Sequence, residues 1–416
     1  TNTITDSSRL STEEDYSAVI YSKEDLIING NGTLNVNAGY RNGIKSTDDC
    51  IIVSGTLNIT STEDGIIGKD LCGIVAGDIN INAGSDGIKS TYDTDTTKGN
   101  VIIEGGNITI KASNDGIQAE NILVINDGTI NIKTNNGAAD TTQTHTDNMD
   151  MDRGGFGFNN NKTTTTTDDT VESRKGIKAG NMLIINDGDI TIDSDDDSVH
   201  CNSEIYIYGG TINAATGDDG VHADDLLTVN GGTINITQCY EGIEADDIVI
   251  NDGDISVVSS DDGINSSDGS ITINGGNLLI NASGDGLDAN GSIIINGGYI
   301  VVLGPTSDGD TAIEYDDSCT INGGTVMAFG SSGMLEIPKG ASNGACIVTA
   351  FTSVSGGSKY TLSDSNGNEI LSYTPSKAYA AAIVYSDKIT TGNTYNITAG
   401  STTLSIEVTS DVTRNV

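Results

Sequence analysis

Tryptophan is absent from the sequence, and the aromatic residues together make up only 4% of it. Such a chain offers few side chains for an aromatic stacking platform as its main binding device. Six cysteines among 416 residues are also too few for a disulfide scaffold. Cys50 and Cys72 lie one repeat period apart, and we expect them to stack as small core residues rather than as a disulfide.

Positive charge is equally scarce, because 19 Lys and Arg stand against 59 Asp and Glu, a formal net charge of −40. A chain of this charge repels nucleic acid and anionic lipid, which excludes both as partners. No apolar run approaches the roughly 18 residues that a transmembrane helix needs, so we expect no membrane insertion. Disorder is excluded for most of the chain because its apolar residues recur at a fixed period.

Two short motifs alternate with a period of about 22 residues. One is an apolar strand followed by Asn-Gly or Asn-Asp-Gly, as in 250–253 and 273–276. The other reads Asp-Gly-Ile-x-Ala or close to it, and its glycines are Gly43, Gly65, Gly87, Gly116, Gly176, Gly220, Gly242, Gly263 and Gly286. Alternation such as Thr-Ile-Asn-Ile at 233–236 sends every second side chain inward. Glycine at the turns supplies positive φ, and asparagine can stack in ladders.

A coil of 22 residues holds three short strands and three turns, and it cannot bury its apolar face alone. The sequence therefore predicts an all-β protein, a right-handed parallel β-helix of about a dozen stacked coils. We assign residues 1–330 to this β-helix, with a long polar loop inserted at about 138–173. Residues 331–416 carry alternating segments without the repeat, and we expect a small antiparallel β cap over the open end.

Stacking turns residues one period apart into columns, and three such columns are rich in acid. Five carboxylates at ~4.8 Å intervals repel one another by roughly 1 kcal/mol per neighbour in water. Oxygen-rich sites of this kind suit Ca²⁺. The candidate metal ligands are Asp196, Asp197, Asp218, Asp219, Glu241, Glu244, Asp261, Asp262, Asp285 and Asp288. A solvated acidic turn column is the alternative interpretation.

Tyr240 and His222 lie in the same columns and are candidates for ligand contact. His200 and His222 stack and could also indicate a transition metal, but the chain has three histidines and no thiolate in register. Residues 180–337 contain no Lys or Arg against 28 Asp and Glu. The acidic columns therefore have no counter-charge of their own within these coils.

The segments 25–34, 42–46 and 86–90 resemble the opening coils of a clostridial carbohydrate-binding β-helix family. This resemblance implies a secreted or cell-surface protein that binds cellulose-like and pectic polysaccharides and carries Ca²⁺ in a fold similar to polysaccharide lyases. One lyase family holds calcium with Asp-Asp-Gly-x-Asp. The segments 218–222 and 261–265 match its first three positions and not its last.

We therefore expect a calcium-binding, non-catalytic protein that recognises plant cell-wall glycans, either cellulose or polygalacturonate and pectin, with no catalytic residue. A calcium-dependent pectate lyase is the first alternative, and it needs a base near the metal. Lys178 is the only basic residue close enough in sequence, and the absence of Lys and Arg from 180–337 speaks against a lyase. A surface adhesin or structural spacer is the second alternative.

Overall fold

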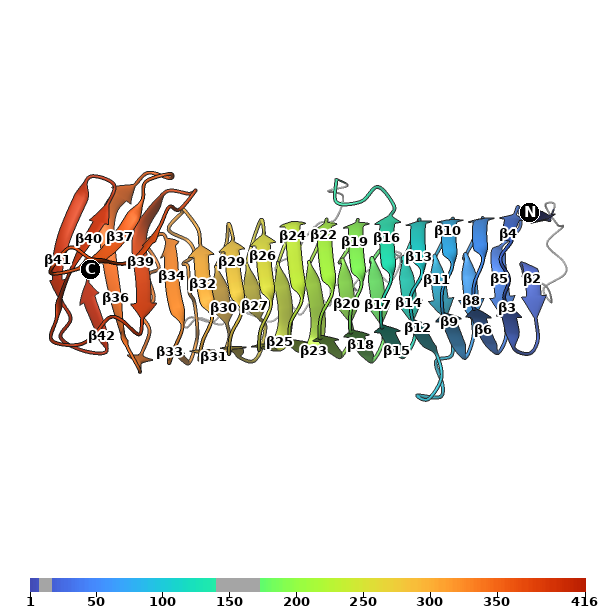
Figure 1. The fold of residues 1–416 in the computed structure, drawn as a ribbon, viewed down its shortest axis with the longest axis horizontal. Coiled ribbons are helices and arrows are strands. Elements are labelled where there is room, and N and C mark those ends of the chain that lie inside the picture. Colours follow the sequence, from blue (N-terminus) through green and yellow to red (C-terminus); the bar gives the residue numbers. More distant parts are fainter. Residues whose placement is uncertain (7–16, 140–172) are drawn as a thin grey trace, which may run out of the picture.

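The computed structural model describes residues 1–6, 17–139 and 173–416. These residues form a parallel β-solenoid of about 13 turns of roughly 22 residues, with a small antiparallel sheet near the C-terminus and no helix. Figure 1 shows the coils stacked along one axis into a rod, with the C-terminal strands at the far end. The fold class predicted from the repeat is confirmed. None of the described residues forms a helix of the length and hydropathy that a membrane crossing requires.

Each coil contributes one strand of four to six residues to a long sheet, here called sheet A. Its thirteen parallel strands are β1 (Asn2–Thr5), β4 (Thr33–Ala38), β7 (Thr56–Ser61), β10 (Asp78–Ala83), β13 (Asn107–Ala112), β16 (Thr129–Thr134), β19 (Asp189–Ser194), β22 (Thr211–Thr216), β24 (Thr233–Gln238), β26 (Asp254–Val258), β29 (Asn277–Asn281), β32 (Tyr299–Leu303) and β34 (Thr325–Gly330).

Two further strands of each coil stack into two more columns. The first column is β2 (Ala18–Ser22), β5 (Asn42–Ser46), β8 (Ile66–Gly68), β11 (Ile88–Ser90), β14 (Ile117–Ala119), β17 (Ile177–Ala179), β20 (Val199–Cys201), β23 (Val221–Val229), β25 (Ile243–Ile250), β27 (Ile264–Ser266) and β30 (Leu287–Ala289). The second is β3 (Leu26–Ile28), β6 (Asp49–Ile52), β9 (Leu71–Ile74), β12 (Asn100–Ile103), β15 (Ile122–Ile125), β18 (Met182–Ile185), β21 (Glu204–Ile207), β28 (Ile271–Ile273), β31 (Ser292–Ile295), β33 (Ser318–Ile321) and β35 (Gly340–Ala341), and the long strands β23 and β25 continue into it.

The core of the solenoid follows from the period of two within each strand. In β10 the side chains alternate between exposed and buried, so that Ile79 and Ile81 face inward. Ile79 pairs in register with Ile108 of the next coil, and this stacking repeats along the rod. The result is one continuous interior of Ile, Val, Leu and Ala from Val36 to Tyr385. Cys50 and Cys72 stack in register within it as free thiols, as expected.

The two glycine columns exist for different physical reasons. Glycines of the Asn-Gly turns have positive φ, for example 128° at Gly128 and 94° at Gly298. Glycines of the Asp-Gly motif are not in that region and instead provide space. A Cβ on Gly220 would lie 2.4 Å from the carbonyl oxygen of Gly242 and 2.5 Å from Cδ1 of Ile236. Positive φ, which we expected of turn glycines in general, thus explains only the first column.

The insertion expected at 138–173 lies almost wholly outside the described residues. The coils on its two sides are adjacent, because Ile117 of β14 pairs in register with Ile177 of β17. The repeat therefore continues in register across the insertion.

The C-terminal strands continue sheet A and also cover its outer face. Strand β39 (Tyr379–Ser386) pairs antiparallel with β34, and β36 (Ala345–Val354) and β42 (Val412–Asn415) follow. Sheet C consists of β37 (Tyr360–Asp364), β38 (Glu369–Tyr373), β40 (Thr394–Ala399) and β41 (Thr402–Glu407). Ile383 and Tyr385 extend the solenoid core, whereas Met327 and Phe329 join a second core with sheet C. One sheet thus crosses residue 330, and a domain boundary there stays a prediction.

Candidate metal centre

The columns inferred from the period are present in the structure. The outward residues of the first strand column pair in the order Lys178, His200, His222, Glu244, Asn265 and Asp288. The turns before the last five of these strands carry Asp197, Asp219, Glu241, Asp262 and Asp285, and the backbones of these turns bond from coil to coil. All of these residues lie at one corner of the coil, between sheet A and the first strand column.

The aspartates of the turn have a structural role that the sequence did not reveal. The carboxylate of one coil accepts a hydrogen bond from the backbone N–H of the equivalent residue in the next coil. Asp219 N donates to Asp197 Oδ1 at 3.1 Å, and Asp285 N donates to Asp262 Oδ1 at 2.6 Å. The same bond joins Asp86 to Asp64 in the early coils. One carboxylate oxygen is thus held by the coil above, which fixes the side chain and leaves the second oxygen available.

Basic side chains of the chain itself neutralise the first part of the column. Lys175 Nζ lies 2.9 Å from Asp196 Oδ1 and 2.5 Å from Asp197 Oδ2, and Arg174 pairs with the fully buried Asp195 at 2.7 Å. Burial raises the pKa of Asp197, but Lys175 and the two histidines outweigh it and hold that pKa well below its usual range. These carboxylates are therefore already paired.

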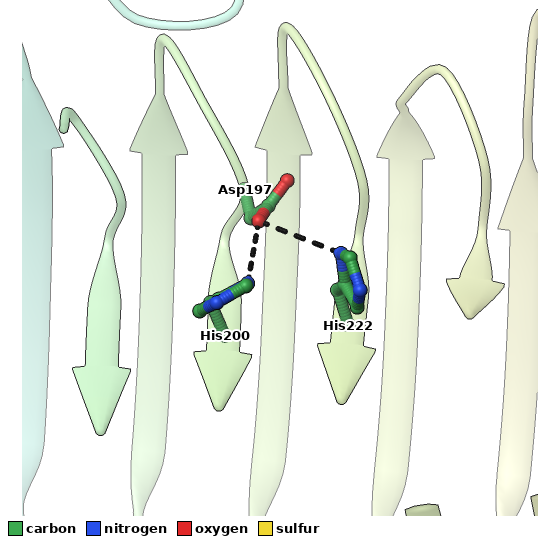
Figure 2. Close-up of side chains that lie close together, drawn as sticks. All are labelled: Asp197, His200 and His222. Carbon is green, nitrogen blue, oxygen red and sulfur yellow. Dashed lines mark ion pairs between the residues drawn. The ribbon is translucent and has the colours of Figure 1, made fainter. Parts of the chain in front are cut away.

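Two histidines occupy the next part of the column, as Figure 2 shows. His200 Nδ1 lies 2.9 Å and His222 Nδ1 3.8 Å from Asp197 Oδ2. His222 Nδ1 also lies 3.3 Å from Asp219 Oδ2 and 3.4 Å from Glu244 Oε2. Burial lowers the pKa of His222, but its hydrogen bond to Asp219 and the charges of Asp197 and Glu244 raise it to about 10.

Within the described part of the chain, the last part of the column has carboxylates and no cation. Oxygens of Asp262, Asp285 and Asp288 lie within 4.8 Å of one another. Burial, followed by the charges of neighbouring carboxylates, raises the pKa of Asp262 to about 8 and that of Asp288 to about 7. Burial and Glu314 raise the pKa of Asp285 to about 9, against the hydrogen bond from Thr311 N. We call these three residues the acidic triad.

The other predicted ligands lie between these clusters. Glu241 accepts a hydrogen bond from Asn265 Nδ2 at 2.9 Å, and burial and Glu244 raise its pKa to about 9. Asp218 lies within 4.8 Å of Asp196 and Asp197, and burial and Asp219 raise its pKa to about 8. Tyr240 is half-buried in the turn, where its backbone bonds to those of Asp218 and Asp261.

The structure also contains a second acidic cluster and a long groove that were not predicted from the sequence. Asp25, Asp48 and Asp49 converge within 4.8 Å at another corner of the first coils, and only the pair Asp48-Asp49 could have signalled it. The groove has a volume of about 710 Å³ and follows the Asn-Gly turns from Gly30 to Asp189. Glycine, Asn, Asp, Ser and Thr line it, so its wall is polar.

Lys178, the basic residue considered for a lyase, lies one coil before His200. Its Nζ lies 3.3 Å from Ser173 Oγ, and its charge lowers the pKa of Asp115, which burial raises more strongly. Tyr206 and Tyr208 stack with ring centroids 6.5 Å apart, and Tyr208 is 53% exposed. They lie on and just beyond β21, in the second strand column.

The comparison with known proteins returns one family. A family model described as "Carbohydrate-binding domain-containing protein" matches residues 1–220 and again 218–411. No curated protein and no solved structure matches the chain. The resemblance seen in the opening coils is thereby confirmed at the level of a carbohydrate-binding family.

Proposed function

Because the chain belongs to a family of carbohydrate-binding domain-containing proteins, we propose that it is a non-catalytic polysaccharide-binding protein that holds Ca²⁺ at its acidic columns. The cation links the acidic protein to uronate carboxylates of a pectic polymer. Such polymers of plant cell walls lie outside cells, so the proposal implies a secreted or cell-surface protein.

The observation that carries the calcium proposal is the acidic triad, where three converging carboxylates have no cationic partner among the residues that the structure describes. Arg174 forms an ion pair with Asp195, and Lys175 forms ion pairs with Asp196 and Asp197. In contrast, residues 180–337 contain no Lys or Arg. Burial first, and then the charges of neighbouring carboxylates, raise the pKa values of the triad. A divalent cation placed among these oxygens would remove the repulsion.

The donor set fits calcium. Ca²⁺ takes six to eight oxygen ligands at 2.3–2.6 Å with flexible geometry, and the triad offers carboxylate oxygens only. Hydrogen bonds from Asp285 N and Thr311 N hold one oxygen each of Asp262 and Asp285. The triad cannot fill the coordination sphere alone, which leaves positions for water or for a uronate carboxylate.

The test is binding of polygalacturonate, measured by affinity electrophoresis with Ca²⁺ and with a chelator. We expect Ca²⁺ to retard the wild-type protein and the chelator to abolish the retardation. The double variant Asp262→Asn, Asp288→Asn should lose it, whereas the control Asp252→Asn, Asp268→Asn removes the same charge at exposed positions and should keep it. Retardation that is equal with and without Ca²⁺ would contradict the calcium bridge.

The groove favours a second ligand class, neutral glycans such as cellulose. It runs along the rod, as a bound polymer chain would, and its Asn, Ser and Thr side chains can exchange hydrogen bonds with sugar hydroxyls. Binding there needs no metal. Cellulose pull-down that survives chelation and falls on substitution of Asn31 and Asn107 would assign neutral glycans to the groove.

The remaining alternatives give different results in the same assays. A calcium-dependent lyase would release unsaturated products from polygalacturonate, and Lys178→Ala would stop it. An adhesin or spacer would bind neither polymer, while keeping any stabilisation by Ca²⁺.

A further inference from the structure

The two stacked histidines form a cluster distinct from the acidic triad. His200 and His222 occupy equivalent positions in adjacent coils, with ring centroids 4.9 Å apart and planes at 76°. Both point towards Asp197, which projects from the turn before β20 (Figure 2). One ring nitrogen of each histidine and a carboxylate oxygen of Asp197 lie within 4.8 Å of one another.

The outer ring nitrogens face oxygens of residues at the same offset in each coil. Nε2 of His200 lies 2.9 Å from Asn202 Oδ1, and Nε2 of His222 lies 3.6 Å from Asp224 Oδ1. An amide oxygen only accepts, so Nε2–H of His200 donates to Asn202 Oδ1, and Nδ1 faces the centre of the cluster. Metal-binding histidines are oriented in this way, by a carbonyl or carboxylate on the ring nitrogen away from the metal.

Nδ1 of His200 gives an independent sign of a missing ligand. The residue is only 8% exposed, and among the described residues this atom has no hydrogen-bond partner, although Asp197 Oδ2 lies 2.9 Å away. A buried ring nitrogen without a hydrogen-bond partner costs free energy. A cation at the centre of the cluster would satisfy it.

We propose that Asp197 Oδ2, His200 Nδ1 and His222 Nδ1 bind a divalent transition metal of the zinc class. Imidazole nitrogen suits Zn²⁺, Cu²⁺ and Ni²⁺, whereas Ca²⁺ selects oxygen. Tetrahedral zinc with bonds of 2.0–2.1 Å places its ligand atoms about 3.4 Å apart. The distances of 2.9 and 3.8 Å from Asp197 Oδ2 bracket that value.

The surrounding charges complete the site. Asp219 Oδ2 and Glu244 Oε2 lie 3.3 and 3.4 Å from His222 Nδ1 and offer a fourth ligand or an acceptor for a metal-bound water. Lys175 bonds to the same oxygen of Asp197, which has lone pairs for both partners. The site stands apart from the acidic triad, and it does not depend on the polysaccharide proposal.

The test uses the full chain, stripped of metal, titrated with Zn²⁺ by calorimetry in excess Ca²⁺. We expect one Zn²⁺ per chain in the wild-type protein. His200→Gln and His222→Gln should each abolish this stoichiometric binding, and Asn202→Ala should weaken it by about 10–100-fold. The variant Asp262→Asn, Asp288→Asn should bind Zn²⁺ as the wild type does, so that a failure of the calcium proposal is told apart from a failure here.

Co²⁺ provides a spectroscopic readout, because a four-coordinate site gives intense visible absorption and a hydrated ion does not. His145→Gln, a change at the chain's third histidine, is the matched control and should leave the spectrum unchanged. Should the His200 and His222 variants fail to fold, Asn202→Ala tests the same site with both histidines in place. The proposal is overturned if the wild type takes up no Zn²⁺, or if both histidine variants bind Zn²⁺ with the affinity of the wild type.

Discussion

Each aspartate of the turn column joins two coils, because its carboxylate accepts a hydrogen bond from a backbone N–H of the next coil. The same carboxylate adds a negative charge. The two effects separate in an Asp→Asn substitution, because an amide oxygen still accepts the hydrogen bond. Where Lys175 already neutralises the charge, as at Asp197, such a change removes a favourable ion pair. In the acidic triad it removes repulsion.

We therefore predict opposite effects of Asp288→Asn with and without metal. In the chelated protein at pH 8 the variant should melt higher than the wild type, on the order of a few degrees, because one mutually repelling charge is gone. With saturating Ca²⁺ the order should reverse, since a ligand is missing. Thermal melts under both conditions measure this, and a variant that is less stable under both would refute the account of the triad.

Close packing at the Asp-Gly glycines yields a second prediction. Ser198 replaces glycine in one coil, and Ala214 there takes the sheet A position that isoleucine holds in the neighbouring coils, at Ile192 and Ile236. Gly220→Ser should cost about 1–3 kcal/mol of unfolding free energy through overpacking. Adding Ile236→Ala should recover part of that loss relative to the sum of the single changes. Strict additivity in chemical denaturation would contradict this coupling.

At the residue scale, what could be predicted depended on the period. The stacking order His200, His222 and Glu244 followed directly from the spacing, because residues one period apart in the sequence lie side by side in adjacent parallel coils. The pairing of Lys175 with Asp197 did not, because the insertion hides that Lys175 occupies the column position after Asp115. The hydrogen bonds from side chain to backbone were also invisible, since aspartate before glycine is equally typical of ordinary turns.

Strands and turns are held along the rod by asparagine ladders as well as by the sheets. Exposed side-chain amide hydrogen bonds of 2.8–3.0 Å link the asparagines of successive coils, namely Asn251, Asn274, Asn296 and Asn322. Tyr208 interrupts this ladder between Asn186 and Asn230. The ladder that we expected from the Asn-Gly motif is confirmed, and its interruption coincides with an exposed aromatic side chain.

Substitutions in the ladder should change stability in both directions. Asn274→Ala removes two hydrogen bonds and should cost about 1–2 kcal/mol, reduced by solvent exposure. Tyr208→Asn can connect Asn186 to Asn230 and should stabilise the protein. If Tyr208→Asn is stabilising but weakens glycan binding, the tyrosine side chain contacts the glycan. Denaturant melts of both variants, with Thr228→Ala as a control on the same outer face, give the measurement.

At the element scale the strands of the solenoid were predictable and the cap was less so. Alternation gives a strand wherever it occurs, so the existence of strands after residue 330 was expected. The choice of strands that join sheet A could not be predicted, because antiparallel partners such as Phe329 and Ala382 are not separated by the repeat period. The apolar outer face of β34, where Met327 and Phe329 are buried under sheet C, is the local signal for that docking.

For the whole molecule, the charge of −40 makes stability depend on pH and on divalent cations. In the folded protein the pKa values of Asp262, Asp285, Asp288 and Glu241 are raised to about 8, 9, 7 and 9. Groups with raised pKa stabilise the fold fully below their unfolded values near 4, and this stabilisation is lost as pH rises through the folded values.

The chelated protein should therefore melt at progressively lower temperature from pH 5 to pH 9. Ca²⁺ should flatten this slope, because it replaces the protons on the carboxylates. The paired Asp197 has the opposite shift, and it loses its contribution only below the usual aspartate range, outside this window. Melts at fixed ionic strength test the slope, and a melting temperature that rises towards pH 9 without metal would be inconsistent with an unpaired triad.

The central claim, that unpaired carboxylates of the solenoid bind calcium for carbohydrate recognition, is tested most directly by calorimetric titration of the chelated protein with Ca²⁺, alone and with polygalacturonate. We predict saturable Ca²⁺ binding that tightens when the polymer is present and that disappears in Asp262→Asn, Asp288→Asn. No binding heat in the wild type, or equal Ca²⁺ affinity with and without polymer, would contradict the claim and leave the column as a solvated acidic face.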